Sequence, residues 1–142
     1  MCICLLACAQ RSMPMANDSQ SDVDSIVQAV LTNYASDACI VSRSLTIPTI
    51  SLGHFTELGL SESAAQALTQ SIANQSQRNW KEILKHRFGD QGDCLSISYP
   101  MLYGDSKFAY IIVADLYGQY EYIYEYSEPT WRLYRTLSIS IH

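Results

Sequence analysis

The amino-acid sequence predicts an α+β fold, with helices in the first half and an antiparallel sheet at the end. Apolar residues recur at spacings of three and four early in the chain, which is typical of helices with one buried face. In the last third they alternate with polar residues and short turns, as in a strand meander. A chain of 142 residues is about the size of one domain, and we assign residues 21–142 to it.

The first helix is predicted to begin at Ser21 and to end near Ser36. Ser21 and Asp24 have the spacing of a capping box, in which each side chain satisfies a free backbone N–H group. The apolar positions expected to share one face are Val23, Ile26, Val27, Val30, Leu31 and Tyr34.

The middle of the chain carries weaker signals. Residues 39–50 are rich in β-branched side chains and predict a strand. A second helix is predicted from near Ser61, with Ser63 and Gln66 as its capping box. Residues 80–88 fit either a helix face or a short strand, and both alternatives stay open.

Four strands are predicted at residues 95–99, 107–116, 120–126 and 131–141. The second is apolar on both faces, as expected for the centre of a sheet. In the last, the residues expected to share a face are Leu133, Leu137, Ile139 and Ile141. We expect a four-stranded antiparallel meander with the helices on one face. This order is similar to that of cystatin-like and nuclear-transport-factor-like cone folds.

The composition argues against several functions. Nine basic against fourteen acidic residues leave a net charge of −5, whereas nucleic-acid binding needs a basic surface. No run approaches the roughly 18 apolar residues of a membrane-spanning helix. The sequence has neither a Gly-x-Ser-x-Gly elbow nor a glycine-rich phosphate loop. We therefore expect no cofactor and no metal, assign no catalytic residue, and favour a protein that is not an enzyme.

The amino terminus resembles that of bacterial lipoproteins. Leu5, Leu6, Ala7 and Cys8 match a lipobox, in which the cysteine sulfur receives a diacylglycerol group and the peptide before it is removed. The resemblance implies a signal remnant at residues 1–8, a flexible tether at residues 9–20 and a lipid anchor in a bacterial envelope. The alternative is a cytoplasmic protein translated from Met13 or Met15.

Two cysteines remain after such processing. With Cys2 and Cys4 removed and Cys8 lipidated, only Cys39 and Cys94 are left. In an oxidising compartment they could form a disulfide, which would stabilise the fold by about 4 kcal/mol on the loop-entropy model. Two separate buried thiols are the alternative, and the sequence does not decide between them.

A tyrosine-rich strand is the candidate binding face. Its four alternating tyrosines are Tyr120, Tyr122, Tyr124 and Tyr126. Rings with hydroxyl tips could bind a sugar or a partner protein. The alternative, which we favour, is that this face packs on the helices while Glu121 and Glu125 mark the solvent side.

Two histidine groupings and one basic cluster complete the candidates. The groupings that could ligate a metal are His54 with Glu57, and His86 with Asp90 and Asp93. Neither has the paired spacing of a zinc motif, so surface positions are favoured. The basic cluster around Trp80 could meet lipid headgroups or an acidic partner, or be a solvated face, and it comprises Arg78, Lys81, Lys85 and Arg87.

The C-terminal third resembles a family of uncharacterised secreted bacterial proteins. The residues that carry the resemblance are Ser98, Pro100, Ala109, Ile111, Val113, Trp131 and Leu133. The family implies no activity. The sequence thus predicts a non-enzymatic envelope lipoprotein that binds a protein or small ligand. The alternatives are an enzyme with a pocket between sheet and helices, or an inhibitor or immunity-type protein whose acidic surface complements a basic target.

Overall fold

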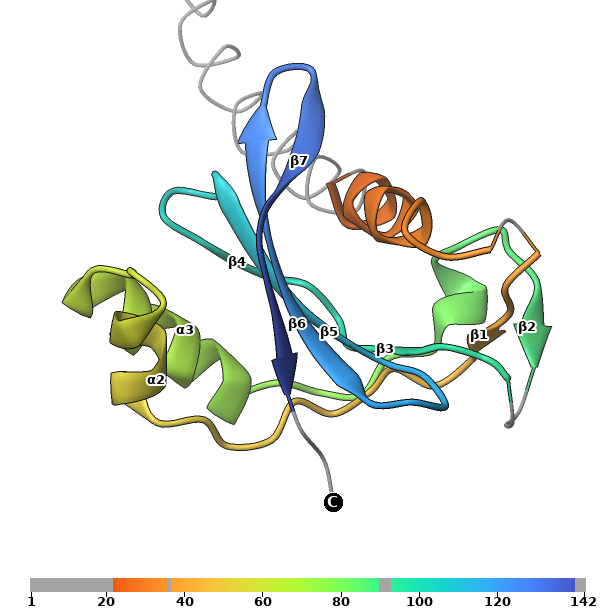
Figure 1. Cartoon of the computed structure of the whole chain (residues 1–142), viewed down its shortest axis with the longest axis horizontal. Coiled ribbons are helices and arrows are strands. Elements are labelled where there is room, and N and C mark those ends of the chain that lie inside the picture. Colours follow the sequence, from red (N-terminus) through yellow and green to blue (C-terminus); the bar gives the residue numbers. More distant parts are fainter. Residues whose placement is uncertain (1–21, 36, 90–92, 140–142) are drawn as a thin grey trace, which may run out of the picture.

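A five-stranded sheet with helical structure on both sides forms the centre of the computed structural model (Figure 1). The structure describes residues 22–35, 37–89 and 93–139. The predicted signal remnant, the tether, Cys8 and the Ser21 cap lie outside these residues. The α+β class is confirmed. No helix in the described part of the chain is long and apolar enough to cross a bilayer.

The first helix covers residues 22–31 and ends earlier than predicted. Two side chains just beyond its end donate hydrogen bonds to carbonyl groups of its last turn: Thr32 Oγ1 to Ala29 O, and Asn33 Nδ2 to Val30 O. These local hydrogen bonds compete with continuation of the helix. The expected apolar face is confirmed at its four buried members, Val23, Ile26, Val27 and Val30.

Two further helices form a hairpin. They are α2 (Leu52–Glu57), which was not predicted, and α3 (Glu62–Ala73). The predicted start of α3 near Ser61 is confirmed, but its cap differs. Ser61 Oγ accepts the N–H of Ala64, so Ser61 is the N-cap and Ser63 lies within the first turn.

The sheet contains β3 (Ser96–Ile97), β4 (Met101–Tyr103), β5 (Phe108–Ala114), β6 (Gln119–Ser127) and β7 (Thr130–Ile139). Its path is β3-β5-β6-β7, and β4 also pairs with β5. All these pairings are antiparallel. Five strands replace the expected four, because a break at Pro100, which has no N–H group for the ladder, divides the partner of β5 in two.

A small parallel sheet joins β1 (Ile40–Val41) to β2 (Phe88–Gly89), and the 3-10 turn η1 (Trp80–Glu82) precedes β2. The predicted strand at residues 39–50 is wrong beyond Val41. This segment instead forms isolated bridges from Arg43 to Asn79 and from Leu45 to Ser98. Because successive residues of this segment pair with different parts of the chain, no continuous strand ladder forms beyond Val41.

Both faces of the large sheet are buried, which corrects the expectation that helices cover only one. Ala109, Ile111 and Val113 of β5 pack in a core with the helix at 22–31 and Trp80. The alternate residues Tyr110 and Ile112 pack with α2 and α3. A central strand that is apolar on both faces requires a cover on each.

Candidate functional site

The tyrosine-rich face of β6 is largely part of the core. Tyr122 and Tyr124 are buried against the helix at residues 22–31, Tyr120 is half-buried, and only Tyr126 is exposed, at 41%. Tyr126 packs against Trp131, with ring centroids 5.3 Å apart. Two of the four rings of the candidate binding face are therefore not accessible to a ligand.

Hydrogen bonds join the hydroxyl groups of Tyr122 and Tyr124 to residues that follow the first helix. The Tyr34 and Tyr122 hydroxyls are 2.8 Å apart, and Asn33 Nδ2 donates to Tyr124 Oη at 2.9 Å. Burial, together with the Tyr122 hydroxyl, raises the pKa of Tyr34 well above its ordinary value. Burial also raises the pKa of Tyr124 to about 12, although the hydrogen bond from Asn33 opposes this shift. These hydrogen bonds connect the segment just after the first helix to β6.

The opposite face of β6 holds a buried acid that sequence reasoning placed in solvent. Glu121 is only 2% exposed and accepts hydrogen bonds from Tyr110 Oη and from His54 Nε2, the latter at 2.9 Å from both carboxylate oxygens. When the Glu121 side chain is ionised it can only accept, and Nε2 of His54 then carries the hydrogen. Burial, and next the hydrogen bond and charge of Glu121, raise the pKa of Tyr110 well above its ordinary value.

This polar cluster connects α2 to the sheet. His54 is on α2 with its side chain 35% exposed, and the neighbouring Phe55 is fully buried edge-on against Tyr110. The enclosed side chain of Glu121 thus holds α2 against the sheet.

In the part of the chain that the structure describes, the two candidate histidines bond to groups outside their predicted groupings. His54 meets Glu121, while Glu57 is exposed. His86 Nε2 lies 2.8 Å from Ala38 O, and Asp90 is outside the described residues. Within the described ranges, the structure contains no group of three or more His, Cys, Asp or Glu side chains that could hold a metal ion.

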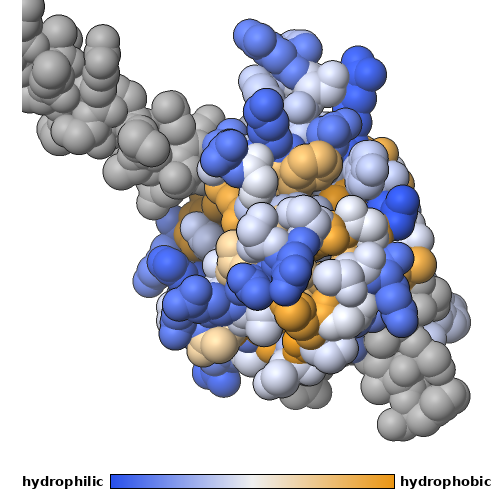
Figure 2. All heavy atoms as spheres, turned by 90° about the vertical axis from the view of Figure 1, so that its left-hand side faces the viewer, coloured by the Kyte–Doolittle hydropathy of each residue, from blue (hydrophilic) through white to orange (hydrophobic). Residues whose placement is uncertain are grey.

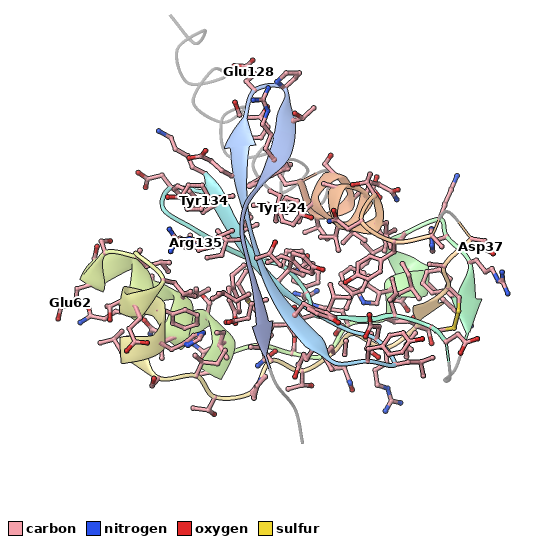
Figure 3. All side chains as sticks on the ribbon, in the orientation of Figure 1. Asp37, Glu62, Tyr124, Glu128, Tyr134 and Arg135 are labelled. Carbon is pink, nitrogen blue, oxygen red and sulfur yellow. A yellow bond between two sulfur atoms is a disulfide. The ribbon has the colours of Figure 1, made fainter. Side chains whose placement is uncertain are left out.

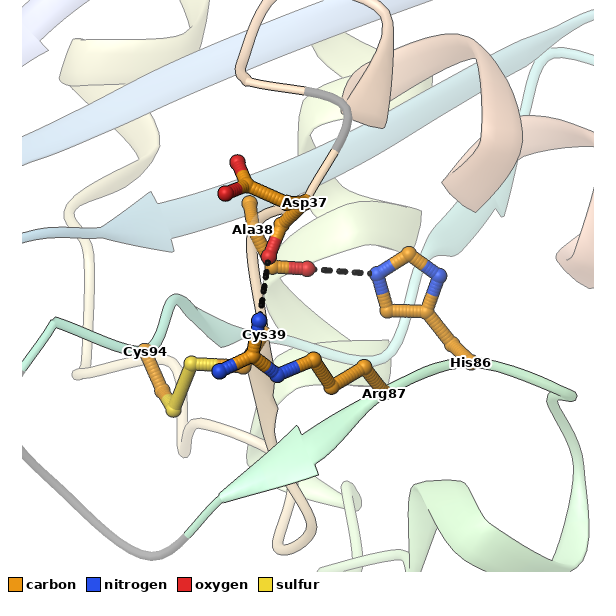
Figure 4. Close-up of a disulfide and its surroundings, with 6 residues drawn as sticks. All are labelled: Asp37, Ala38, Cys39, His86, Arg87 and Cys94. Atoms are coloured by element: carbon orange, nitrogen blue, oxygen red, sulfur yellow. Dashed lines mark hydrogen bonds between the residues drawn. A yellow bond between two sulfur atoms is a disulfide. The ribbon is translucent and has the colours of Figure 1, made fainter.

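A disulfide joins Cys39 and Cys94, with an S–S distance of 2.03 Å (Figure 4). Of the two alternatives left open by the sequence, the structure contains the bridge. A Cβ atom added to Gly89 would lie 2.5 Å from Cys94 Sγ, so the bridge packs directly on the backbone of β2. Next to it, Arg87 Nη1 donates to Asp37 O at 3.3 Å.

A β-bulge in β7 brings two neighbouring side chains to the same face. Ile123 pairs with Arg135 but Tyr124 pairs with Leu133, which leaves Tyr134 as the extra residue. Tyr134 and Arg135 both lie on the α2–α3 side of the sheet, while Tyr124 lies on the other (Figure 3). The bulge also corrects the expected common face of Leu133 and Leu137, because the alternation of the strand shifts between them.

The connection between α2 and α3 faces this bulge and has its own fixed geometry. Leu60 N–H donates to Phe55 O and Gly59 N–H donates to Thr56 O, which together form a Schellman motif. Gly59 has a φ of 95°, which a residue with a side chain rarely adopts. Arg135 Nη1 donates to the carbonyl group of Leu58 and joins the connection to β7.

A cavity of about 180 Å³, here called the aromatic pocket, lies between the connection and the sheet. Residues 58–61 and Ala64 line one side, and Tyr103, Gly104, Phe108 and Tyr134 line the other. The Phe108 ring stacks on Tyr103 at 5.3 Å and meets Tyr134 edge-on at 5.7 Å. Figure 2 shows apolar surface exposed between polar side chains on this side of the molecule.

The electrostatics of the aromatic pocket suit a neutral ligand group. Burial raises the pKa of Tyr103 to about 12, so its phenol stays protonated at neutral pH and can donate a hydrogen bond. Tyr134 is 54% exposed at the mouth, and the Arg135 guanidinium lies 5.7 Å from its ring centroid. The pocket therefore combines an apolar interior with a polar rim.

Sequence reasoning missed the aromatic pocket because its walls come from segments far apart in the chain. One local signal was present: Ser51 before α2 and Gly59 after it are typical helix-boundary residues. The bulge has no comparable signal. Comparison with known protein families, curated proteins and solved structures found no match to this chain.

Proposed function

We propose that this protein is a non-enzymatic, lipid-anchored binding protein of a bacterial envelope, whose aromatic pocket holds one apolar or aromatic group of a protein or small ligand. The observation that carries the binding proposal is the bulge in β7. It places the Tyr134 ring over the cavity and ties the α2–α3 connection down through Arg135. Bulges are over-represented beside functional sites, where they redirect side chains.

The size of the aromatic pocket limits what can enter. Its volume of about 180 Å³ is close to that of an engineered apolar cavity of about 150 Å³ that binds benzene. It is smaller than the roughly 300–1,000 Å³ typical of drug-sized ligand sites. One ring or one branched side chain fits, so the rest of a partner would contact the polar rim.

The location proposal is supported by the lipobox at Cys8 and by cysteine use. A disulfide such as Cys39–Cys94 is typical of exported proteins, because the cytosol keeps most thiols reduced. The tether proposed at residues 9–20 would separate the folded part from the membrane surface.

Binding can be tested with indole as the probe, by titration followed with NMR. We expect shifts at residues around Tyr134 and Phe108, with weaker binding in Tyr134→Ala, which removes one wall, and in Ala64→Leu, which fills the cavity. Ala73→Leu adds the same side chain at an exposed position of α3 and serves as the control. The proposal is contradicted if indole binds the parent and the three variants equally well, or if it does not bind the parent at millimolar concentration.

Location is tested separately, by intact mass and membrane fractionation of the protein expressed from its native gene. We expect a chain that begins at Cys8, carries fatty acyl chains and sediments with membranes. Cys8→Ser should release it to the soluble fraction. A soluble, unacylated protein would overturn the envelope assignment and leave the binding proposal standing.

A further inference from the structure

A second hollow, of about 330 Å³, lies where segments 42–43 and 77–81 meet. Its lining residues are Ser42, Arg43, Gln77, Arg78, Asn79 and Lys81. We call it the basic hollow, because half of these side chains carry a positive charge. Two of them, Arg78 and Lys81, belong to the basic cluster recognised in the sequence, whereas Arg43 joins them only through the fold. Lys85 and Arg87 do not line it.

Main-chain and buried side-chain hydrogen bonds hold the two segments together. Ser44 N–H donates to Arg78 O at 2.9 Å, and Arg78 N–H donates to Ser44 Oγ at 2.7 Å. Ser44 is only 3% exposed. Trp80 N–H donates to Ser42 O, and Trp80 itself is fully buried. The backbone under the three cations is thus fixed before any ligand arrives, which lowers the entropic cost of binding.

The three cations of the basic hollow have no acidic partner in the part of the chain that the structure describes. No salt bridge within 4.0 Å joins Arg43, Arg78 or Lys81 to a carboxylate among the described residues. They gather although the chain as a whole carries a net charge of −5. The Arg78 guanidinium is held over the Tyr99 ring, 4.8 Å from its centroid. A group of cations without an acidic partner, on a fixed backbone, attracts an anion.

Arg78 also lines a larger hollow of about 530 Å³, whose wall is half polar and half apolar and contains no other charged side chain. Gln75 in its wall is engaged by the main chain of Ile47, through both its amide oxygen and its amide nitrogen. The side chains of Gln70 and Asn74 make no hydrogen bond within the described part of the chain and remain available. Amide groups of this kind match hydroxyl groups of a ligand.

We propose that the basic hollow binds a phosphate- or sulfate-type oxyanion, and that the hydroxylated, uncharged part of the same molecule extends past Arg78 into the larger hollow. Guanidinium groups pair with such oxyanions through two parallel hydrogen bonds, and the lysine adds a compact charge. This site is independent of the aromatic pocket. The oxyanion can belong to a free small molecule or to a lipid headgroup, and the experiment separates the two.

The test uses the full chain with Cys8→Ser, so that no lipid anchor contributes. Calorimetric titration with glucose 6-phosphate is compared with inorganic phosphate and with glucose. We expect glucose 6-phosphate to bind more tightly than inorganic phosphate, and glucose not to bind measurably. In R43Q/K81Q the dissociation constant should rise about tenfold or more, because two charge-assisted contacts are lost. K85Q/K107Q removes the same charge at exposed positions outside the hollow and should change it less than about twofold.

Co-sedimentation with phosphatidylglycerol vesicles, against phosphatidylcholine vesicles, forms the second arm. Vesicle binding that R43Q/K81Q abolishes, without binding of glucose 6-phosphate, assigns the oxyanion to a lipid headgroup. Equal affinity for inorganic phosphate and glucose 6-phosphate removes the larger hollow from the site. The proposal is overturned if neither probe binds, or if both double variants lose binding equally.

Discussion

Glu121 is the residue whose environment most changes the interpretation of the sequence. A carboxylate removed from water is tolerated only when donors satisfy it, and here Tyr110 and His54 supply them. Loss of one donor leaves the acid buried and incompletely paired, which costs more than one exposed hydrogen bond. The cluster therefore contributes to stability by fixing α2 against the sheet.

Tyr110→Phe removes the buried donor and keeps the ring. We expect the free energy of unfolding to fall by about 1–3 kcal/mol, measured by urea denaturation at pH 7. Tyr126→Phe, at an exposed tyrosine of the same sheet, should stay within about 0.5 kcal/mol of the parent. In a double-mutant cycle with Glu121→Gln, the two effects should not add. Full additivity would show that the hydroxyl and the carboxylate are not coupled.

Gly89→Ala tests the contact between the disulfide and β2. The added Cβ would lie 2.5 Å from Cys94 Sγ, so we expect a loss of about 1–3 kcal/mol from overpacking. Gly53→Ala, where nothing lies within 4 Å, should be neutral or stabilising within α2. In a Cys39→Ala/Cys94→Ala background the cost at Gly89 should largely disappear. The same cost in both backgrounds would contradict this assignment.

The α2–α3 hairpin shows how local rules set an element's geometry. Ser61 both follows the Schellman motif and caps α3, so one short connection ends one helix and begins the next. This arrangement positions Leu58 and Leu60 at the aromatic pocket. The hairpin then reaches the sheet through buried Phe55 and Leu68.

Ser61→Ala removes the cap of α3 and should lower the free energy of unfolding by about 1 kcal/mol. Ser63→Ala is the matched control, since Ser63 is exposed and its side chain accepts no hydrogen bond from the helix backbone in the structure; we expect a change below about 0.5 kcal/mol. Both values come from chemical denaturation. A larger effect at Ser63 would place the cap where the sequence pattern first suggested it.

The molecule as a whole contains buried phenols on both faces of its sheet. Burial raises the pKa of Tyr34, Tyr103, Tyr110 and Tyr124 above the ordinary value of 10.0. Above pH 10 the unfolded chain releases protons that the native protein retains. The unfolded state is then favoured, so stability should fall as the pH rises from 10 toward 12 and stay unaffected by these groups below pH 10.

Denaturation between pH 9 and pH 11.5, with free thiols alkylated, measures this loss. Each of these tyrosines adds up to about 1.4 kcal/mol per pH unit to the slope. In Tyr103→Phe the free energy of unfolding should decline less steeply with pH, because the contribution of one tyrosine to the slope is removed. Tyr117→Phe, at a side chain that is 89% exposed, should leave it unchanged. Parallel curves for the parent and Tyr103→Phe would show that Tyr103 titrates equally in both states.

Local patterns determined the elements with a continuous periodicity. The α+β order, the buried face of the first helix, the start of α3 and the two-sided burial of β5 follow from residues close together in the chain. In these elements, burial of one apolar face or one apolar strand determines the conformation. The spacing of apolar residues along the chain therefore predicts it.

The tertiary structure alone decided the rest. The alternation of residues in its strand predicts that Glu121 faces solvent. In the structure it is buried, because His54 of α2 and Tyr110 of β5 hydrogen-bond to its side chain. Likewise, the aromatic pocket needs a bulge that one extra residue creates against β6, and the basic hollow needs Arg43 beside residues 77–81. The free energy of each arrangement depends on contacts between distant segments, which spacing along the chain does not encode.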